Sequence, residues 1–255
     1  MKRIFYILLL LQISAVMLFA SSDTDGERKT KTLYPLPAVI IMDAYRYLET
    51  LDRFSIDAIT TNDDYFQEAM IATFTHQVHI DLQRPGKLYI EVNGDLKNRS
   101  FYLNDGQFTI YDENLDYYGK LELSKKIDTA LDDLFEYYDI KTSLANLLYS
   151  DLYKRIPPKN KGYYFGISEV DGIECHHIGF ESSVEEIQFW IEKGKRPLIR
   201  KFIVIDKTES HLPRSGTMLR WNTDPKFSSE HFIFLPMDTT IQIAIEAYAK
   251  KEKSI

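Results

Sequence analysis

The sequence has little of several residue types, and each scarcity excludes a class of protein. It contains one cysteine, Cys175, in 255 residues, so it can form neither an intramolecular disulfide framework nor a zinc site built only from cysteines. Glycine and proline number only 11 and 9, which excludes collagen-like and low-complexity chains. What remains, 44% hydrophobic and 27% charged residues, is the composition of an ordinary globular protein.

Positive charge is also in deficit. The chain has 31 Lys and Arg residues against 38 Asp and Glu residues, which gives a formal net charge of −7. A surface that neutralises phosphates over a wide area needs the opposite balance. We therefore expect no nucleic-acid partner.

The amino terminus has the layout of a secretory signal peptide. Lys2 and Arg3 precede an apolar stretch, 4–20, which is followed by small residues. The stretch is 17 residues long and is interrupted by polar side chains, whereas a membrane-spanning helix needs about 20 apolar residues. Cleavage is therefore favoured over an uncleaved anchor. We predict a signal peptide at 1–22, a flexible leader at 23–35 and a single domain at 36–255.

Hydrophobic periodicity predicts an α+β chain. Apolar residues three and four positions apart predict four helical segments, at 38–52, 127–138, 144–152 and 241–253. Alternating apolar and polar residues predict eleven strands, at 54–58, 72–82, 88–92, 101–103, 108–111, 117–123, 163–170, 173–181, 185–192, 198–206 and 217–221. The early strands follow one another without the crossover of roughly ten residues that parallel neighbours need, so the predicted sheet is antiparallel.

Several segments resemble a family of predicted periplasmic proteins of unknown function, and the likeness covers nearly the whole chain after the signal peptide. These segments are Phe101–Asp112, Ala130–Leu134, Leu147–Asp151, Val170–His177, Phe189–Glu192 and Arg196–Lys201. That family is in turn similar to the lipoprotein carriers of the LolA and LolB type. The resemblance implies a strongly curved, half-closed antiparallel sheet with helices covering its open side and a hydrophobic cavity between them. It also implies a location in the periplasm of a Gram-negative bacterium.

The function implied by this resemblance is to shelter a lipid or lipoprotein acyl chain from water. Each buried methylene contributes roughly 0.8 kcal/mol, so an acyl chain can be held without any reactive group. Such a carrier needs no cofactor and no metal, and we expect no enzyme activity. The candidate cavity residues are Phe54, Ile56, Phe74, Val78, Leu88, Ile90, Phe101 and Leu103 from the sheet, with Leu131, Leu134, Phe135, Leu144, Leu147 and Leu148 from the helical segments.

Two other interpretations stay open at this point. In the first, the protein is a periplasmic sensor, in which a bound lipid changes its affinity for an envelope membrane protein. In the second, it is an envelope scaffold whose interior is filled by Phe and Tyr side chains and holds no cavity. An empty interior space would discriminate against the scaffold.

The titratable residues do not form a recognisable catalytic or metal motif. His176 and His177 are neighbours on a predicted strand, so their side chains point to opposite faces and cannot readily share an ion. We expect one to face the core and the other the solvent. His76 and His79, three positions apart, meet the same objection. Cys175 is predicted to be a small buried residue rather than a reactive thiol.

Overall fold

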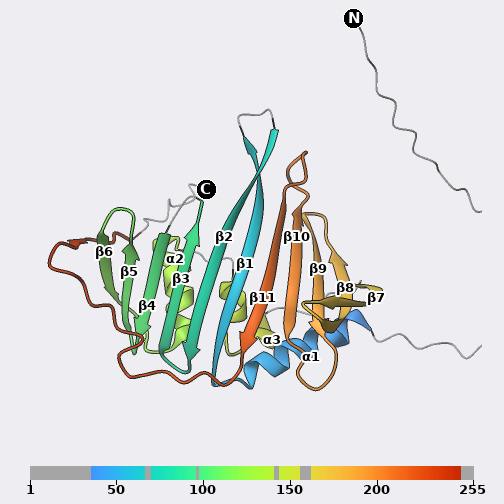
Figure 1. The fold of residues 1–255 in the computed structure, drawn as a ribbon, viewed down its shortest axis with the longest axis horizontal. Coiled ribbons are helices and arrows are strands. Elements are labelled where there is room, and N and C mark those ends of the chain that lie inside the picture. The colour runs from blue at the N-terminus through green and yellow to red at the C-terminus, as the bar shows by residue number, and fades with distance from the viewer. Residues whose placement is uncertain (1–35, 67–69, 96–97, 141–143, 156–161, 248–255) are drawn as a thin grey trace, which may run out of the picture. The chain divides into compact units, whose positions relative to one another are not determined.

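Twelve strands form one sheet, and the helices lie together on one of its faces (Figure 1). The computed structural model describes residues 36–66, 70–95, 98–140, 144–155 and 162–247. The predicted signal peptide and leader lie outside these described residues.

The helices are α1 (Pro37–Glu49), α2 (Ile127–Tyr138) and α3 (Leu152–Arg155), with a 3-10 turn at Ala145–Leu147. The strands of the first half are β1 (Arg53–Phe66), β2 (Met70–Gln83), β3 (Lys87–Gly94), β4 (Asn98–Asn104), β5 (Gln107–Asp112) and β6 (Tyr117–Glu122). Those of the second half are β7 (Gly162–Val170), β8 (Ile173–Glu181), β9 (Glu185–Glu192), β10 (Ile199–Asp206), β11 (Arg214–Asn222) and β12 (Ile241–Ile243).

The strand order is β12-β6-β5-β4-β3-β2-β1-β11-β10-β9-β8-β7. The two halves of the chain meet where β1 pairs with β11, in the middle of the sheet. All pairs are antiparallel except β12 with β6. The outermost strands, β12 and β7, do not pair with each other, so the sheet is open and not a closed barrel. This confirms the predicted α+β fold with a half-closed, mainly antiparallel sheet and helices on one side.

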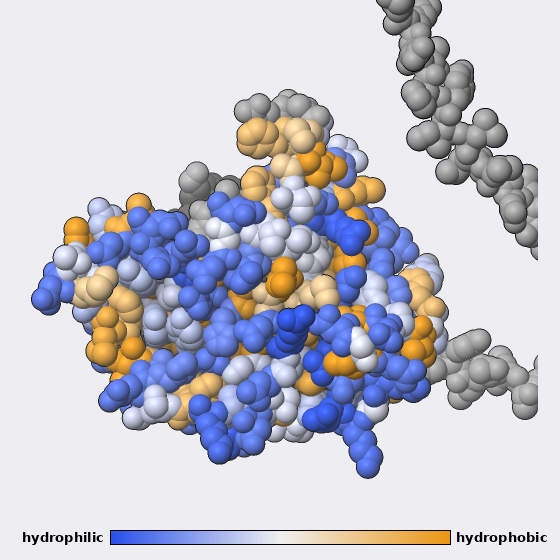
Figure 2. All heavy atoms as spheres, viewed as in Figure 1, coloured by the Kyte–Doolittle hydropathy of each residue, from blue (hydrophilic) through white to orange (hydrophobic). Residues whose placement is uncertain are grey.

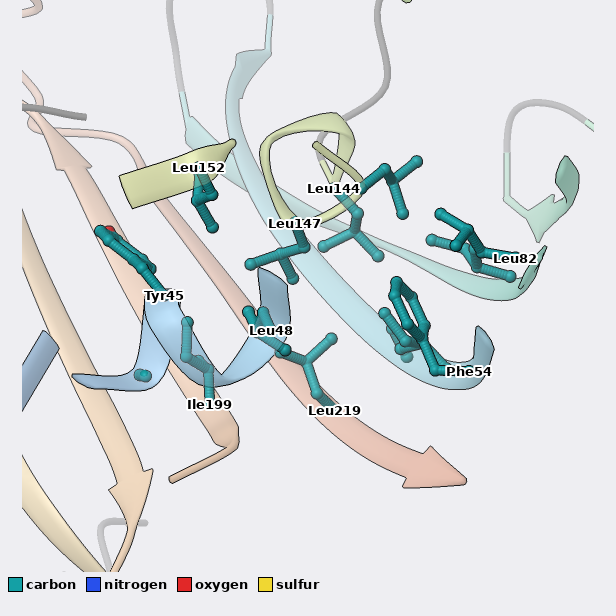
Figure 3. Packing of buried hydrophobic residues seen from close by; sticks show 14 of the residues in the cluster. Tyr45, Leu48, Phe54, Leu82, Leu144, Leu147, Leu152, Ile199 and Leu219 are labelled. Atoms are coloured by element: carbon teal, nitrogen blue, oxygen red, sulfur yellow. The ribbon is translucent and has the colours of Figure 1, made fainter. Parts of the chain in front are cut away.

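The main core fills the space between the sheet and the helices. From α1, Tyr45 and Leu48 point toward the sheet, where they meet side chains of β1, β10 and β11 (Figure 3). Leu48 and Phe54 are completely buried. Complete burial of an apolar side chain of this size contributes roughly 1.5–3 kcal/mol to stability. The apolar stripe of α1 therefore packs this helix against the sheet.

The chain's end differs from the sequence prediction. A helix was predicted at 241–253, but Ile241–Ile243 is strand β12, and residues 244–247 have no regular structure. The remaining residues of the predicted helix lie outside the described ones. The reason is the period-two spacing of Ile241, Ile243 and Ile245, which suits an edge strand. Ile245 packs directly over Gly119 of β6, where a side chain would collide with it.

Between β11 and β12, residues 223–240 cross the face of the sheet opposite the helices; we call this segment the strap. In Figure 1 it is the long connection that runs from the foot of β11 past β4 to β6. Phe234 anchors it by contacting the rings of Tyr102, Tyr111 and Tyr118 on three neighbouring strands, at centroid distances of 5.4, 5.0 and 5.3 Å. The strap therefore places β12 at the edge of the sheet.

The β1–β2 hairpin projects beyond its neighbours. Pairing of β1 with β11 ends at Asn62, and pairing of β2 with β3 ends at His76, so the outer part of the hairpin is a two-stranded ribbon. Hydrophobic atoms gather at its far end (Figure 2). The exposed side chains there are Tyr65, Phe66, Met70 and Ile71. These residues take no part in the main core.

Candidate functional site

A cavity of about 480 Å³ lies between strands β3–β5 and the helical segments. We call α2 together with residues 144–155 the lid. The sheet contributes Leu88, Ile90, Phe101 and Phe108 to the lining. The lid and the turn after α2 contribute Leu131, Asp132, Leu134, Phe135, Ile140, Ala145, Asn146, Tyr149, Leu152 and Arg155.

Strand alternation sets the sheet wall of the cavity. Leu88 and Ile90 are two residues apart on β3, so both point to the helix-covered face. Ile90 pairs directly with Phe101 of β4. Leu88 pairs with Leu103, which in turn pairs with Phe108 of β5. This register assembles a continuous apolar surface from three adjacent strands.

The opposite wall follows from the helical period of α2. Leu131, Leu134 and Phe135 are spaced by three and four positions and therefore share one face. The helix ends at Asp139, whose φ of 53° turns the chain back on itself. This allows the backbone N–H of Ile140 to donate to the carbonyl of Leu134 at 3.0 Å. Ile140 is thereby folded into the lining.

Hydrogen bonds hold the lid on the sheet. The guanidinium of Arg84, beside the β2–β3 turn, donates to the carbonyls of Leu148 and Tyr149 at 2.9 and 3.3 Å. Asp128 of α2 accepts hydrogen bonds from both the backbone N–H and the hydroxyl of Ser150. The Arg84 bonds join the lid to the end of β2, and the Asp128–Ser150 bonds join the two segments of the lid to each other.

Three of the lining side chains form a polar cluster, which we call the polar end of the cavity. Arg155 forms a forked pair with Asp132, at 2.8 and 3.0 Å, and its Nε donates to Asp151 at 2.5 Å. The guanidinium also covers the ring of Tyr149, 3.9 Å from its centroid. The Tyr149 hydroxyl donates to Asp132 at 2.9 Å. Asn146 also lines the cavity, is exposed, and makes no hydrogen bond to another described residue.

These contacts shift two pKa values away from neutrality. Burial, together with the hydrogen bond to Asp132, raises the pKa of Tyr149 to about 12. Burial alone would raise the pKa of the Asp132 carboxyl, but the hydrogen bonds from Arg155 and Tyr149 outweigh it and lower that pKa. At neutral pH the tyrosine is therefore protonated and the carboxyl is ionised.

Comparison with known proteins assigns the chain to a family. Residues 38–246 match the model of a family described as predicted periplasmic protein, DUF2092. The chain belongs to the DUF2092 family. This confirms the resemblance drawn from the sequence and supports a periplasmic protein. No curated protein matches the sequence of this DUF2092 member.

Solved structures with a similar fold share little sequence with this DUF2092 member. An uncharacterised conserved protein from Thermus thermophilus is 9% identical, with a TM-score of 0.45 over 81% of this chain and 97% of the other. LprF from Mycobacterium bovis is 10% identical, with a TM-score of 0.42 over 74% and 94%. A LolA superfamily protein from Nitrosomonas europaea is 8% identical, with a TM-score of 0.33 over 78% and 98%.

Six of the fourteen residues named from the sequence line the cavity of this DUF2092 protein: Leu88, Ile90, Phe101, Leu131, Leu134 and Phe135. Seven others are buried in the main core and are not among the lining residues: Phe54, Ile56, Val78, Leu103, Leu144, Leu147 and Leu148. Phe74 is half-buried in the outer part of β2, away from the cavity. Ligand contact by any of them stays a prediction.

Sequence reasoning missed several lining residues. Tyr149 lies in a predicted helical segment of which only leucines were named as cavity residues, Arg155 lies beyond that segment, and Ile140 follows the predicted helix at 127–138. The signal for Phe108 was present, because it alternates with Thr109 on a strand already predicted. The polar end could not be read from the sequence, since Asp132 and Arg155 are 23 residues apart.

His176, His177 and Cys175 make contacts within the sheet. His176 hydrogen-bonds the Tyr164 hydroxyl at 3.2 Å, whereas His177 hydrogen-bonds Gln188 at 3.0 Å and stacks on Trp190. The two rings thus have separate partners, as expected for strand neighbours, but both are half-buried, so neither simply faces solvent. Cys175 is completely buried, as predicted, and burial raises the pKa of its thiol to about 11.

The described part of the chain contains no group of three or more His, Cys, Asp or Glu side chains placed to hold a metal ion. No helix within it has the length and apolar character to cross a membrane.

Proposed function

We propose that this protein binds an acyl chain of a lipid or lipoprotein in the cavity beneath the lid and carries it through the periplasm without altering it chemically. The observation that carries the proposal is the cavity itself. Its walls are built from apolar side chains of two layers, and its volume of about 480 Å³ falls in the range of roughly 300–1,000 Å³ found for ligand sites.

An acyl chain suits these walls. Leu88, Ile90 and Phe101 face Leu131 and Leu134 across the cavity, and all five side chains are hydrocarbon. Each methylene moved from water into such a space contributes roughly 0.8 kcal/mol, so twelve would contribute on the order of 10 kcal/mol before the cost of ordering the chain. An interior closed by aromatic rings, as in a scaffold, would leave no such space.

The polar end supports binding rather than catalysis. A general acid or base works best when its pKa lies near the operating pH. The pKa of Asp132 is lowered and that of Tyr149 is raised, so both move away from neutral pH. Asp132, Tyr149 and Arg155 are also committed to one another through hydrogen bonds. We therefore propose a carrier that makes no covalent change to its cargo.

Native mass spectrometry of the protein purified after export to a bacterial periplasm tests this function. We expect a stoichiometric adduct whose organic extract contains acyl chains. The decisive variant is Ala145→Trp, because Ala145 lines the cavity and an indole there would fill it. Ala145→Ser is the matched control, since it changes the same position without filling the space.

The expected result is an adduct on the wild type and on Ala145→Ser, with most of it lost from Ala145→Trp. Thermal unfolding of all three proteins shows whether the tryptophan variant is folded. If the wild type is free of ligand and takes up no offered uncharged fluorescent acyl ester, the carrier function is wrong.

A further inference from the structure

The charges at the polar end of the cavity bear on which lipid head group can lie there. Among the described residues that line the cavity, Arg155 is the one cation and Asp132 the one anion. Asp151 adds a second carboxylate that contacts the same guanidinium. This group of three side chains therefore carries a net charge of −1.

Arg155 is already engaged on several sides. Its two terminal nitrogens form the forked pair with Asp132, and its Nε donates to Asp151. One face of the guanidinium lies on the Tyr149 ring, 3.9 Å from the centroid. These bonds use three of the five guanidinium N–H groups, and both carboxylates lie against the same guanidinium, so an anion that approaches the remaining N–H groups also approaches Asp132 and Asp151.

An anionic head would also meet repulsion. A carboxylate or phosphate brought to this end would approach Asp132 and Asp151, and like charges placed together disfavour binding. An uncharged head meets no such opposition. A hydroxyl can donate to the carboxylate of Asp132, and the side-chain amide of Asn146, which bonds no other described residue, can both donate and accept.

We infer that the cavity selects an acyl chain whose head group is uncharged and hydrogen-bonding, such as an acyl ester or amide with free hydroxyls, and rejects free fatty-acid anions. This inference rests on the proposed function, because it names the ligand class of the same cavity. Asp132 acts here as the specificity-determining residue. It neutralises Arg155 and so removes the cation that a fatty-acid carboxylate would need.

The test compares two ligands with the same twelve-carbon chain, dodecanoate and 1-monododecanoylglycerol. Each displaces an uncharged fluorescent acyl probe from the exported, delipidated protein at pH 8, where the fatty acid in solution is ionised, and below the concentration at which either ligand forms micelles. For the wild type we expect the acylglycerol to bind about tenfold more tightly, the effect of roughly one charge-assisted hydrogen bond.

The variant Asp132→Asn removes one carboxylate while keeping the shape of the side chain. It leaves the charge of Arg155 compensated only by Asp151, so dodecanoate should gain about tenfold in affinity and the preference should disappear. The control is Asp112→Asn, which breaks a similar pair, Arg99 Nε to Asp112 Oδ2 at 2.8 Å, outside the cavity lining. That variant should keep the wild-type preference.

The possible results of this test distinguish failure of the head-group inference from failure of the proposed carrier function. Equal or tighter binding of dodecanoate by the wild type, or an unchanged preference in Asp132→Asn, would overturn the head-group inference and leave the carrier function standing. Failure of the protein to bind the acyl probe would remove the function itself. A diacylglyceryl lipopeptide, tested as a third ligand, shows whether a lipoprotein head or a free acylglycerol is the better source of this chemistry.

Discussion

His231 of the strap donates a hydrogen bond from its Nε2 to Asp81 of β2, 2.7 Å away and 150 residues earlier in the chain. The donor assignment follows because an ionised carboxylate can only accept. Asp81 is buried, and it also accepts from the Ser55 hydroxyl at 2.5 Å and from His79 Nε2 at 2.9 Å. One carboxylate therefore joins β1, β2 and the strap.

Removal of that carboxylate should destabilise the protein strongly. Asp81→Ala leaves the buried Ser55 and the half-buried His231 without their acceptor, so we expect a loss of about 2–4 kcal/mol in the free energy of unfolding. Asp57→Ala is the control, because Asp57 also bonds His79 but is exposed, and its loss should cost less than about 1 kcal/mol. Urea denaturation measures both, and similar losses for the two variants would contradict the argument.

The same cluster predicts a pH dependence of stability. The hydrogen bond to Asp81 is the largest cause that raises the pKa of His79, from its ordinary value of 6.5 to about 9. A group whose pKa is higher in the folded state stabilises fully below its unfolded value, so this contribution is complete below pH 6.5. It is lost as the pH rises through 9.

Asp81 contributes in the opposite direction. Burial alone would raise its pKa, but hydrogen bonds from His79, Ser55 and His231 outweigh burial and lower it from 3.8. Its contribution is present above pH 3.8 and is lost at more acidic pH. The cluster therefore stabilises most between these limits, from about pH 4 to 6.5.

Urea denaturation at pH 6, 7.5 and 9 tests the loss of stability that is expected as His79 deprotonates. We expect the free energy of unfolding to fall by about 1 kcal/mol over this range, since the ring of His79 is 35% exposed and solvent screens the pair. His79→Gln should flatten the profile, because glutamine does not titrate. A wild-type profile as flat as that of the variant would show that His79 does not stabilise through its charge.

Much of the sheet could be predicted because strand alternation is a local property. The eleven predicted strands all exist, and Leu88 and Ile90 face inward as the pattern requires. Alternation predicts which face of the sheet a side chain occupies. It does not predict where the sheet and the helices leave a cavity between them. Ile56 and Ile90 follow the same pattern, yet one is in the closed core and the other lines the cavity.

Contacts that join distant segments could not be predicted. The sequence shows nothing that pairs His231 with Asp81, or Arg155 with Asp132, because both pairs depend on how the chain returns to the sheet. The final helix was predicted wrongly because Ile241 was read with a helical period. The edge of β6 was open, and its pairing with Ile241–Ile243 decided the local structure.

The aromatic anchor of the strap predicts a local loosening. Phe234→Ala removes contacts with Tyr102, Tyr111 and Tyr118, and we expect a loss of about 1–3 kcal/mol. Hydrogen exchange should speed up at the backbone N–H of Ile241, which donates to the backbone carbonyl of Asp116 at 3.1 Å. Leu235→Ala is the control, because Leu235 is 77% exposed and should change neither quantity. Unchanged exchange at Ile241 in Phe234→Ala would show that β12 is held independently of the strap.

Arg84 links stability to the cavity, because its side chain is mostly buried and it donates to carbonyls of the lid and of the connection between α1 and β1. Its Nε bonds Leu51 at 3.1 Å, and its terminal nitrogens bond Leu148 and Tyr149. Lysine keeps the charge but cannot reach three separate carbonyls with one ammonium group. We therefore expect Arg84→Lys to lose about 2–3 kcal/mol by leaving buried carbonyls without a donor.

The same substitution should change ligand release, since Tyr149 lies in the cavity lining and Arg84 holds its backbone in place. We expect faster hydrogen exchange in residues 147–150 and a several-fold faster dissociation of a bound fluorescent acyl probe, measured by stopped flow. Arg53→Lys is the control, because among the described residues the Arg53 side chain has one ionic contact, a long one of 3.8 Å to the exposed Asp224. The alternative outcome is that Arg84→Lys is less stable but releases the probe at the same rate as Arg53→Lys. In that case the lid opens by a movement that does not break the Arg84 contacts.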